Sequence, residues 1–287
     1  MPKIVFLGAG STIFAKSVLG DCLLTESLRD SELALFDIDP ERLKDSHLML
    51  ETINRHAGGY GKIVSYHDRR EALRGADYVI NAIQVGGYEP STVIDFEVPK
   101  KYGLRQTIAD TLGIGGIFRG LRTLPVMADF ARDMEELCPE AWFLNYTNPM
   151  SILTGYMLRY TGVKTVGLCH SVQVCAPHLL RGLGLPEDGV QYTIAGINHM
   201  AWLLSITRNG EDLYPQIKDL ARKRPQDHDD LVRYEIMKQF GYYVTESSEH
   251  NAEYLPYFIK NRNPELIDRF RIPLDEYPRR CLRQIAG

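Results

Sequence analysis

The alternation of short, β-branched apolar runs with longer helical patterns constrains the fold of this chain more than any other feature. It fills the first half of the sequence and is typical of a parallel sheet whose strands are joined by crossover helices. Strands are predicted at Ile4–Leu7, Leu33–Phe36, Ile63–Tyr66, Tyr78–Ala82, Trp142–Leu144 and Thr165–Leu168. Helices are predicted between them at Glu41–His56, Arg119–Cys138 and Met150–Tyr160. The pattern therefore predicts an α/β fold with a doubly wound parallel sheet.

The sequence changes character after this region. Val190–Ile197 and Ala201–Thr207 have the pattern of two longer strands, and Asn198 and His199 lie between them. Beyond these strands the chain is helical and charged. We therefore predict a boundary near Leu185, with a Rossmann-like domain over residues 1–185 and an α+β domain over residues 186–287.

The composition is that of an ordinary globular protein, with 44% hydrophobic and 24% charged residues and a net charge of −4. This charge gives no electrostatic reason to expect a nucleic acid or an anionic membrane as a partner. The apolar run Ile4–Gly8 is too short for a signal peptide, and no stretch reaches the roughly 20 apolar residues of a membrane helix. The five scattered cysteines show no paired zinc spacing. We expect a cytoplasmic protein with free thiols.

A glycine-rich turn, Gly8-Ala9-Gly10-Ser11, directly follows the first predicted strand. Glycines at such a turn let the backbone approach a pyrophosphate, whose charge then lies at a helix N-terminus. The third glycine of the usual fingerprint would fall at Ile13, so the motif is incomplete and a plain strand–turn–helix remains the alternative.

Asp37 ends the second predicted strand, where a carboxylate can bind the ribose hydroxyls of a dinucleotide and repel a 2′-phosphate. The alternative for Asp37 is a helix cap before Pro40. Taken with Gly8, Gly10 and Ser11, Asp37 favours NAD over NADP as the cofactor.

Two further strand ends carry polar residues. The segment Asn145–Pro149 closes one predicted strand and opens a helix, and the alternative to a ligand site there is a simple Asn-Pro turn. Cys169 and His170 follow the last strand of the predicted sheet. Adjacent residues of an extended chain point to opposite sides, which disfavours mutual activation as a nucleophile. A metal site would need a second ligand, and His199 is the best candidate; a buried cysteine and a hydrogen-bonded histidine are the structural alternatives.

Two more segments concentrate functional groups. Thr107–Gly113 leads into Gly115–Gly120, which we interpret as a glycine-rich loop carrying one carboxylate, Asp110, and one guanidinium, Arg119. Phe240–His250 gathers many ionisable groups in a short span, although an ordinary solvated face would have the same periodicity.

These segments, in this order, resemble glycoside hydrolase family 4 over essentially the whole chain. The resemblance is nearest to the α-galactosidase branch, and the Cys-His-Ser-Val string also occurs in α-galacturonidase relatives. The strings that carry it are Gly8–Phe14, Gly86–Pro90, Thr107–Gly113, Cys169–Val172, Ala195–Ala201 and Phe240–His250.

The resemblance implies a fold like that of lactate and malate dehydrogenases, with NAD and Mn²⁺ as cofactors. In this family NAD⁺ removes a hydride from C3 of the sugar, which acidifies the C2 proton, and the hydride returns after elimination of the glycosidic oxygen and addition of water. Such enzymes are exceptions to the usual scheme of two carboxylates. A small sugar, an α-galactoside, is the implied substrate.

The resemblance also implies residue roles. Cys169 and His199 match the metal ligands, although their softness alone would favour zinc or iron over manganese. Tyr242 matches the base, with Tyr243 in reserve, and His170 is expected to protonate the leaving group. Substrate contacts are expected from Asn148, Asp110 and Arg119.

Family members continue beyond the segment Arg280–Gly287 at which this chain stops. The resemblance therefore implies a partial substrate domain, and a dimer or tetramer where the further residues are present. The alternatives are an α-galacturonidase or α-glucosidase of the same family, an NAD-dependent 2-hydroxy-acid dehydrogenase, and an NAD-binding fragment without activity.

Overall fold

The computed structural model describes residues 1–286, which form two compact units. The first, here called the sheet unit, comprises Met1–Val85 and Gly120–Leu168. The second, the hairpin unit, comprises Gly86–Arg119 and the residues from Cys169 onward. The division differs from the boundary predicted near Leu185, because the residues that follow Leu168 already pack into the core of the hairpin unit.

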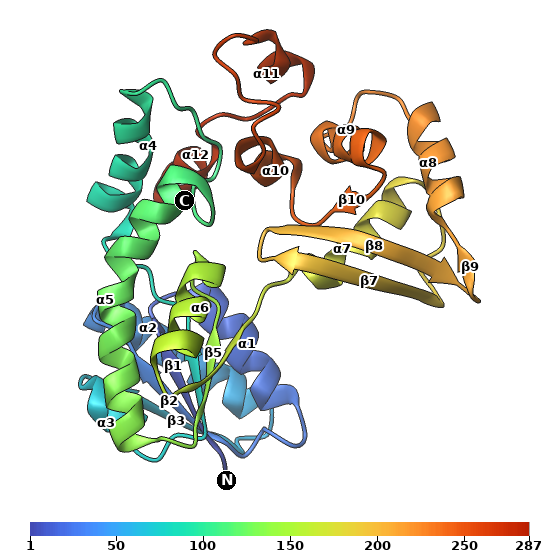
Figure 1. Cartoon of the computed structure of the whole chain (residues 1–287). Coiled ribbons are helices and arrows are strands. Elements are labelled where there is room, and N and C mark those ends of the chain that lie inside the picture. Colours follow the sequence, from blue (N-terminus) through green and yellow to red (C-terminus); the bar gives the residue numbers. More distant parts are fainter. Residues whose placement is uncertain (287) are drawn as a thin grey trace. The chain divides into compact units, whose positions relative to one another are not determined.

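A six-stranded parallel sheet with the strand order β3-β2-β1-β4-β5-β6 forms the centre of the sheet unit (Figure 1). Its strands are β1 (Lys3–Leu7), β2 (Glu32–Phe36), β3 (Lys62–Tyr66), β4 (Tyr78–Asn81), β5 (Trp142–Asn145) and β6 (Lys164–Gly167). The order reverses between β1 and β4, and ligands of doubly wound sheets bind outside the carboxyl ends of strands at such a point. The predicted Rossmann-like sheet and its six strands are confirmed.

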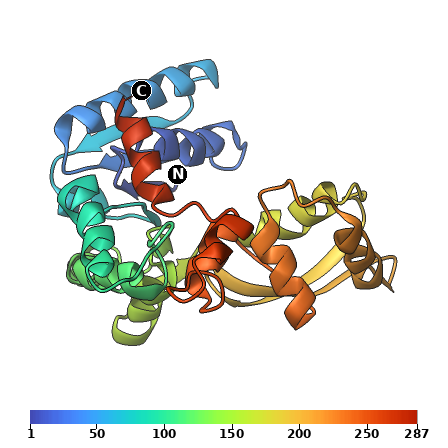
Figure 2. The same cartoon turned by 90° about the horizontal axis from the view of Figure 1, so that it is seen from above.

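Helices cover both faces of this sheet. They are α1 (Thr12–Leu24), α2 (Pro40–His56), α3 (Arg69–Leu73), α6 (Met150–Tyr160) and most of α5 (Gly113–Leu137). Leu19 of α1 and Leu50 of α2 pack on one face, whereas Met127 of α5 and Leu153 of α6 pack on the other, all four fully buried. In Figure 2 the blue helices α1 and α2 and the green helices α5 and α6 accordingly lie on opposite sides of the strands.

The hairpin unit is built around the antiparallel strands β7 (Val190–Ile197) and β8 (Met200–Arg208), with β10 (Tyr243–Val244) and β9 (Glu211–Asp212) paired to β8. Its helical elements are the turn η1 (Gly87–Thr92), α4 (Val93–Lys100), α7 (Ser171–Gly182), α8 (Tyr214–Lys223), α9 (Leu231–Phe240), α10 (Ser248–Tyr254), α11 (Glu265–Arg269) and α12 (Glu276–Ala286). Leu179 of α7 and Ile217 of α8 join Leu203 of β8 in one apolar core. This packing of α7 explains why the unit begins well before Leu185.

The glycine-rich segment Gly115–Gly120 forms the first turns of α5 and not the predicted loop, so the predicted helix start at Arg119 is wrong. A Cβ on Gly115 would lie 2.6 Å from the Cβ of Ala109, and one on Gly116 would lie 2.5 Å from the carbonyl carbon of Thr111. The glycines therefore allow the backbone of residues 109–111 to pack directly against this helix.

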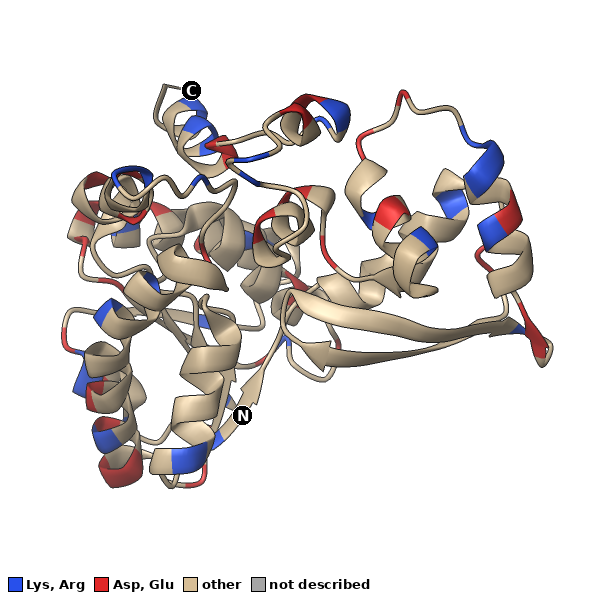
Figure 3. Cartoon of the chain, turned by 45° about the horizontal axis from the view of Figure 1, so that its top comes forward, with Lys and Arg blue, Asp and Glu red and all other residues tan. Residues whose placement is uncertain are grey.

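Charged residues of both signs occur along the helices of both units (Figure 3). Across residues 1–286, no helix combines the length and the apolar character needed to cross a membrane.

Candidate active site

The glycine turn of the sheet unit is held closely against the neighbouring strands. The N–H groups of Gly8 and Ala9 both donate to the carbonyl of Phe36 at 3.0 Å. Gly8 has a φ of 91°, and a Cβ there would lie 2.8 Å from the carbonyl oxygen of Ala82. This conformation and this spacing require glycine.

Asp37 anchors the second glycine of the turn. Its Oδ2 accepts from the N–H of Gly10 at 2.7 Å, and a Cβ on Gly10 would lie 2.8 Å from the same oxygen. The cap of α2 is made by Asp39, whose side chain accepts from two N–H groups of the first turn, so the capping role considered for Asp37 belongs to its neighbour. Ile13 is 74% exposed in α1, so a side chain at this position is not confined between helix and sheet.

The two asparagines after β5 differ in their surroundings. Asn145 is fully buried, and its Oδ1 accepts from the side chain of Asn81 on the neighbouring strand. Asn148 is half-buried; its Oδ1 accepts from the N–H of Met150 at the start of α6, and a cis peptide bond joins it to Pro149. Asn145 is thus a structural link between strands, which leaves Asn148 as the candidate for ligand contact.

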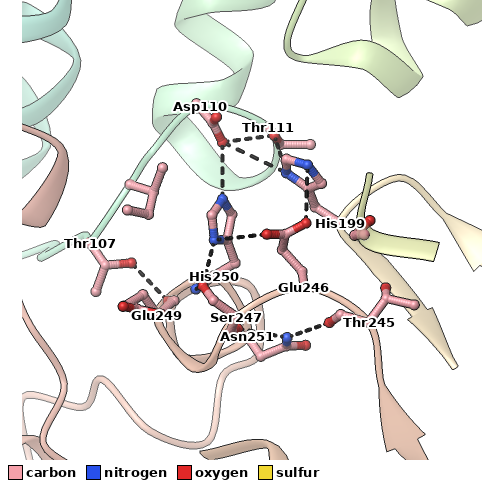
Figure 4. A network of polar contacts seen from close by, with 12 residues as sticks. Thr107, Asp110, Thr111, His199, Thr245, Glu246, Ser247, Glu249, His250 and Asn251 are labelled. Carbon is pink, nitrogen blue, oxygen red and sulfur yellow. Dashed lines mark hydrogen bonds and ion pairs between the residues drawn. The ribbon is translucent and has the colours of Figure 1, made fainter. Parts of the chain in front are cut away.

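A second constellation, here called the polar cluster, lies in the hairpin unit (Figure 4). It consists of Asp110, Thr111, Cys169, His199, Glu246 and His250. Cys169 follows β6, and His199 lies in the tight turn between β7 and β8, where Ile197 pairs with Met200. Cys169 Sγ is 3.3 Å from His199 Nε2, so the structure brings the two predicted ligands together.

Glu246 completes one side of the polar cluster. Its Oε2 lies 3.3 Å from His199 Nε2, and its Oε1 lies 3.8 Å from His250 Nδ1. One ligand atom from each of Cys169, His199 and Glu246 falls within 4.8 Å of the others. A thiol, an imidazole and a carboxylate converging in this way form a donor set that fits a divalent cation.

The opposite edge of the His199 ring is held by a hydroxyl. Nδ1 of His199 lies 2.8 Å from Thr111 Oγ1, which donates to Asp110 Oδ1 at 2.8 Å. Because the Thr111 hydroxyl gives its hydrogen to Asp110, it accepts from the imidazole, which places the ring proton on Nδ1. The other ring nitrogen, Nε2, faces Cys169 and Glu246.

Electrostatic interactions tune these groups. Burial disfavours the Cys169 thiolate, yet hydrogen bonds with His199 and Ser171 lower the pKa of this thiol to about 7. Burial also opposes charge on Asp110, but His250, His199 and Arg119 hold the pKa of its carboxyl far below the usual value. A thiol that ionises readily is a better metal ligand.

Helix α10 supports the loop that carries Asp110. The carboxylate of Glu253 accepts from the backbone N–H groups of Thr107 at 2.7 Å, Ile108 at 3.2 Å and Ala109 at 2.9 Å. Burial raises the pKa of this carboxyl, against the influence of the same backbone donors. Tyr254 OH donates to Asp110 Oδ1 at 3.1 Å, so the helix holds both the loop backbone and its carboxylate.

The remaining predicted residues lie outside the polar cluster as defined above. His170 is exposed at the N-cap of α7, and Tyr242 is 45% exposed after α9, with its ring edge-on to Tyr214. Tyr243 is fully buried and its hydroxyl donates to Asp230, which makes it a core residue and favours Tyr242 as the base.

Sequence reasoning did not single out Thr111, Glu246, His250 or Glu253. Thr111 lies in the segment beside Asp110, Glu246 and His250 lie in Phe240–His250, and Glu253 follows in α10. The density of ionisable groups in these segments was the available signal. What the sequence lacked was a reason to choose among the carboxylates and histidines of that span.

Comparison with known proteins gives a consistent result. Residues 3–185 match the sequence model described as "Family 4 glycosyl hydrolase", and residues 194–286 match that of its C-terminal domain. All of the chain aligns with an alpha-galactosidase of Bacillus subtilis at 67% identity, covering 67% of that protein. The chain spans about half to two thirds of the length of the curated relatives it matches.

Solved structures agree on the fold. A 6-phospho-beta glucosidase of Thermotoga maritima, determined with manganese, NAD+ and glucose-6-phosphate, superposes on the whole chain with a TM-score of 0.77 at 20% identity, covering 65% of that protein. A lactate dehydrogenase of Eimeria maxima superposes with a TM-score of 0.56 at 16% identity, and the match covers 87% of this chain and 71% of the dehydrogenase. The predicted dehydrogenase-like fold is confirmed.

Proposed function

Since the chain belongs to family 4 of the glycosyl hydrolases, we propose that it hydrolyses α-galactosides with NAD and Mn²⁺ as cofactors. The observation that carries the proposal is the 3.3 Å contact between Cys169 Sγ and His199 Nε2 beside a carboxylate. The 67% identity to an alpha-galactosidase supports an α-galactoside as the substrate, in preference to an α-galacturonide or an α-glucoside. The dehydrogenase alternative rests on fold likeness alone.

When bound, NAD would exchange a hydride at C3 of the sugar and the cation would stabilise negative charge on the sugar oxygens. Gly8, Gly10 and Ser11 would line the pyrophosphate, and Asp37 would accept from the ribose hydroxyls. Cys169 and His199 would hold the cation.

The proton transfers fall to two exposed side chains. Tyr242 would take the C2 proton and His170 would protonate the leaving oxygen, and both are open enough to reach a sugar. The contacts of Asp110 favour a supporting role, in which it orients His199 through Thr111, over direct substrate binding. Substrate contacts by Asn148 and Arg119, a cytoplasmic location and assembly into dimers or tetramers stay predictions.

The proposal is tested by turnover of an α-galactoside in D₂O with NAD and Mn²⁺ present. Because C2–H breaks during the cycle, released galactose should carry deuterium at C2. NADH should not accumulate, since the hydride returns in the same cycle. Galactose without deuterium, released with no requirement for NAD, would indicate acid–base hydrolysis and contradict the proposal. Net NADH formation from a 2-hydroxy acid would indicate a dehydrogenase.

Tyr242→Phe sharpens the test. A general base contributes roughly 10²–10⁴-fold to a rate, so the substitution should slow turnover by about that factor and suppress exchange at C2. Tyr243→Phe is the matched control. It removes a buried hydrogen bond to Asp230 and should lower the melting temperature while leaving C2 exchange in place.

A further inference from the structure

We propose that Glu246 is a third protein ligand of the divalent cation, and that its carboxylate sets the preference for a hard cation such as Mn²⁺ over a soft one. The inference rests on the proposed function, because it takes Cys169 and His199 as the other two ligands. Thiolate and imidazole alone favour zinc or iron, so a manganese enzyme needs a further feature to explain its metal.

The distances suit a shared cation. Glu246 Oε2 and Cys169 Sγ each lie 3.3 Å from His199 Nε2. Two donors bound to one cation at about 2.0–2.3 Å lie roughly 3–4.5 Å apart, depending on the angle between them. The three ligand atoms all lie within 4.8 Å of one another, so only small side-chain movements would bring them to coordination distance of one cation.

The two oxygens of Glu246 face different partners. Oε1 faces His250 Nδ1 at 3.8 Å, and Oε2 faces His199 Nε2 at 3.3 Å. The hydrogen-bond partner of His250 Nδ1 is Ser247 Oγ at 2.9 Å, so Oε1 of Glu246 has His250 only as an electrostatic neighbour. Oε2 makes the shorter contact, and it faces the same nitrogen of His199 as the Cys169 sulfur.

The backbone of Glu246 is held in an unusual conformation. Its φ is 66°, in the left-handed region that non-glycine residues seldom adopt. The buried amide of Asn251 donates to the carbonyls of both flanking residues, Thr245 at 2.8 Å and Ser247 at 2.9 Å (Figure 4). His199, the partner across the polar cluster, is likewise left-handed with a φ of 61°. Strained positions that the surrounding structure fixes this firmly cluster at functional sites.

The test measures metal binding directly. Binding of Mn²⁺ is titrated by the electron paramagnetic resonance signal of free Mn²⁺, and binding of Zn²⁺ by competition against it. Glu246→Gln should raise the Kd for Mn²⁺ roughly 10- to 100-fold and the Kd for Zn²⁺ less, because the softer ligands remain. Glu246→Asp keeps the charge on a shorter side chain, so its Kd for Mn²⁺ should lie between those of the wild type and Glu246→Gln.

Glu249→Gln is the matched control. It makes the same change of charge three residues away, on a side chain that pairs with Arg280 at 3.6 Å and lies outside the polar cluster. It should leave both Kd values unchanged, and NAD affinity and the melting temperature of the metal-free protein check folding in every variant.

The outcomes separate the two proposals. If the wild type binds Mn²⁺ and Glu246→Gln binds it equally well, Glu246 is not a ligand, and the proposed function is unaffected. If Mn²⁺ and Zn²⁺ weaken by the same factor, the claim of selectivity is overturned. If the wild type does not bind Mn²⁺, or Cys169→Ser binds it as tightly as the wild type, the metal site of the proposed function itself fails.

Discussion

The glycine turn of the sheet unit and the polar cluster of the hairpin unit are built on opposite principles. The turn uses backbone groups and one carboxylate, all placed by two neighbouring parallel strands in which Leu7 pairs with Phe36. The polar cluster uses side chains from four separate segments, beginning at Asp110, Cys169, His199 and Glu246. A site made of backbone follows from strand register, whereas a site made of side chains depends on the packing of a whole unit.

Loss of a metal ligand should have the largest effect, and it should affect the polar cluster without affecting the glycine turn. Cys169→Ser and His199→Ala should each abolish Mn²⁺-dependent activity, because each removes one of the donors that converge on the cation. NAD affinity should stay nearly intact, since Gly10 and Asp37 belong to the sheet unit. Titration calorimetry with Mn²⁺ and with NAD measures both effects on the same samples.

Oxidation offers an independent control for this prediction. Converting the Cys169 thiol to a sulfenic acid should reproduce the effect of Cys169→Ser, because the oxidised sulfur is a poor metal ligand. Equal Mn²⁺ binding by the wild type, Cys169→Ser and His199→Ala would show that these two residues do not form a metal site.

The next largest effect concerns the carboxylate of the glycine turn. Asp37→Ala should weaken NAD binding by roughly 1.5–3 kcal/mol, through the loss of charge-assisted hydrogen bonds to the ribose. It also releases the N–H of Gly10, and it should reduce discrimination against NADP. Calorimetric Kd values for NAD and NADP check both expectations, and unchanged NAD affinity would show the assignment to be wrong.

Asp39→Ala is the matched control for Asp37. It removes the N-cap of α2 and should lower the free energy of unfolding by about 1 kcal/mol. The ratio of NAD to NADP affinity should stay that of the wild type. A change of that ratio equal to the one in Asp37→Ala would mean that the turn responds to helix stability, not to the carboxylate.

The fold was largely predictable because its signals are local. Alternating patterns gave the strands of the sheet to within a residue at each end, and Asn198 and His199 mark the hairpin turn as expected. The division after Leu168 could not be found from the pattern, which placed the boundary near Leu185, because the sequence of helix α7 does not indicate which core its apolar side joins. Gly115 and Gly116 were interpreted as part of a loop. They are needed because Ala109 and Thr111 approach the helix closely, and this tertiary contact cannot be deduced from the local sequence.

The candidate site was predictable only where chemistry and strand ends coincide. Cys169 and His199 each follow a strand, so the sequence indicated them as candidate metal ligands. Glu246 and His250 were hidden among similar residues, because their roles arise from the left-handed backbone at Glu246 and the clamp by Asn251. Neither the backbone conformation nor the clamp has a sequence signature.

The smallest expected effect tests whether the polar cluster depends on side chains that never touch a ligand. Glu253 lies 146 residues from Thr107 in the chain, yet its carboxylate holds the N–H groups of Thr107 and Ala109. Glu253→Gln keeps one acceptor oxygen and places an amide donor against backbone donors. It should therefore destabilise the protein and lower the free energy of unfolding by about 1–2 kcal/mol, as measured by denaturant unfolding.

The same variant should weaken Mn²⁺ binding by a few-fold, since a looser loop holds Thr111 and hence His199 less firmly. NAD affinity should not change, and Glu249→Gln should alter neither quantity. A loss of stability with no change in the Kd for Mn²⁺ would make Glu253 a structural residue only. Loss of NAD affinity in the same variant would show that the backbone-built turn depends on the packing of the hairpin unit, contrary to the contrast drawn between the two sites.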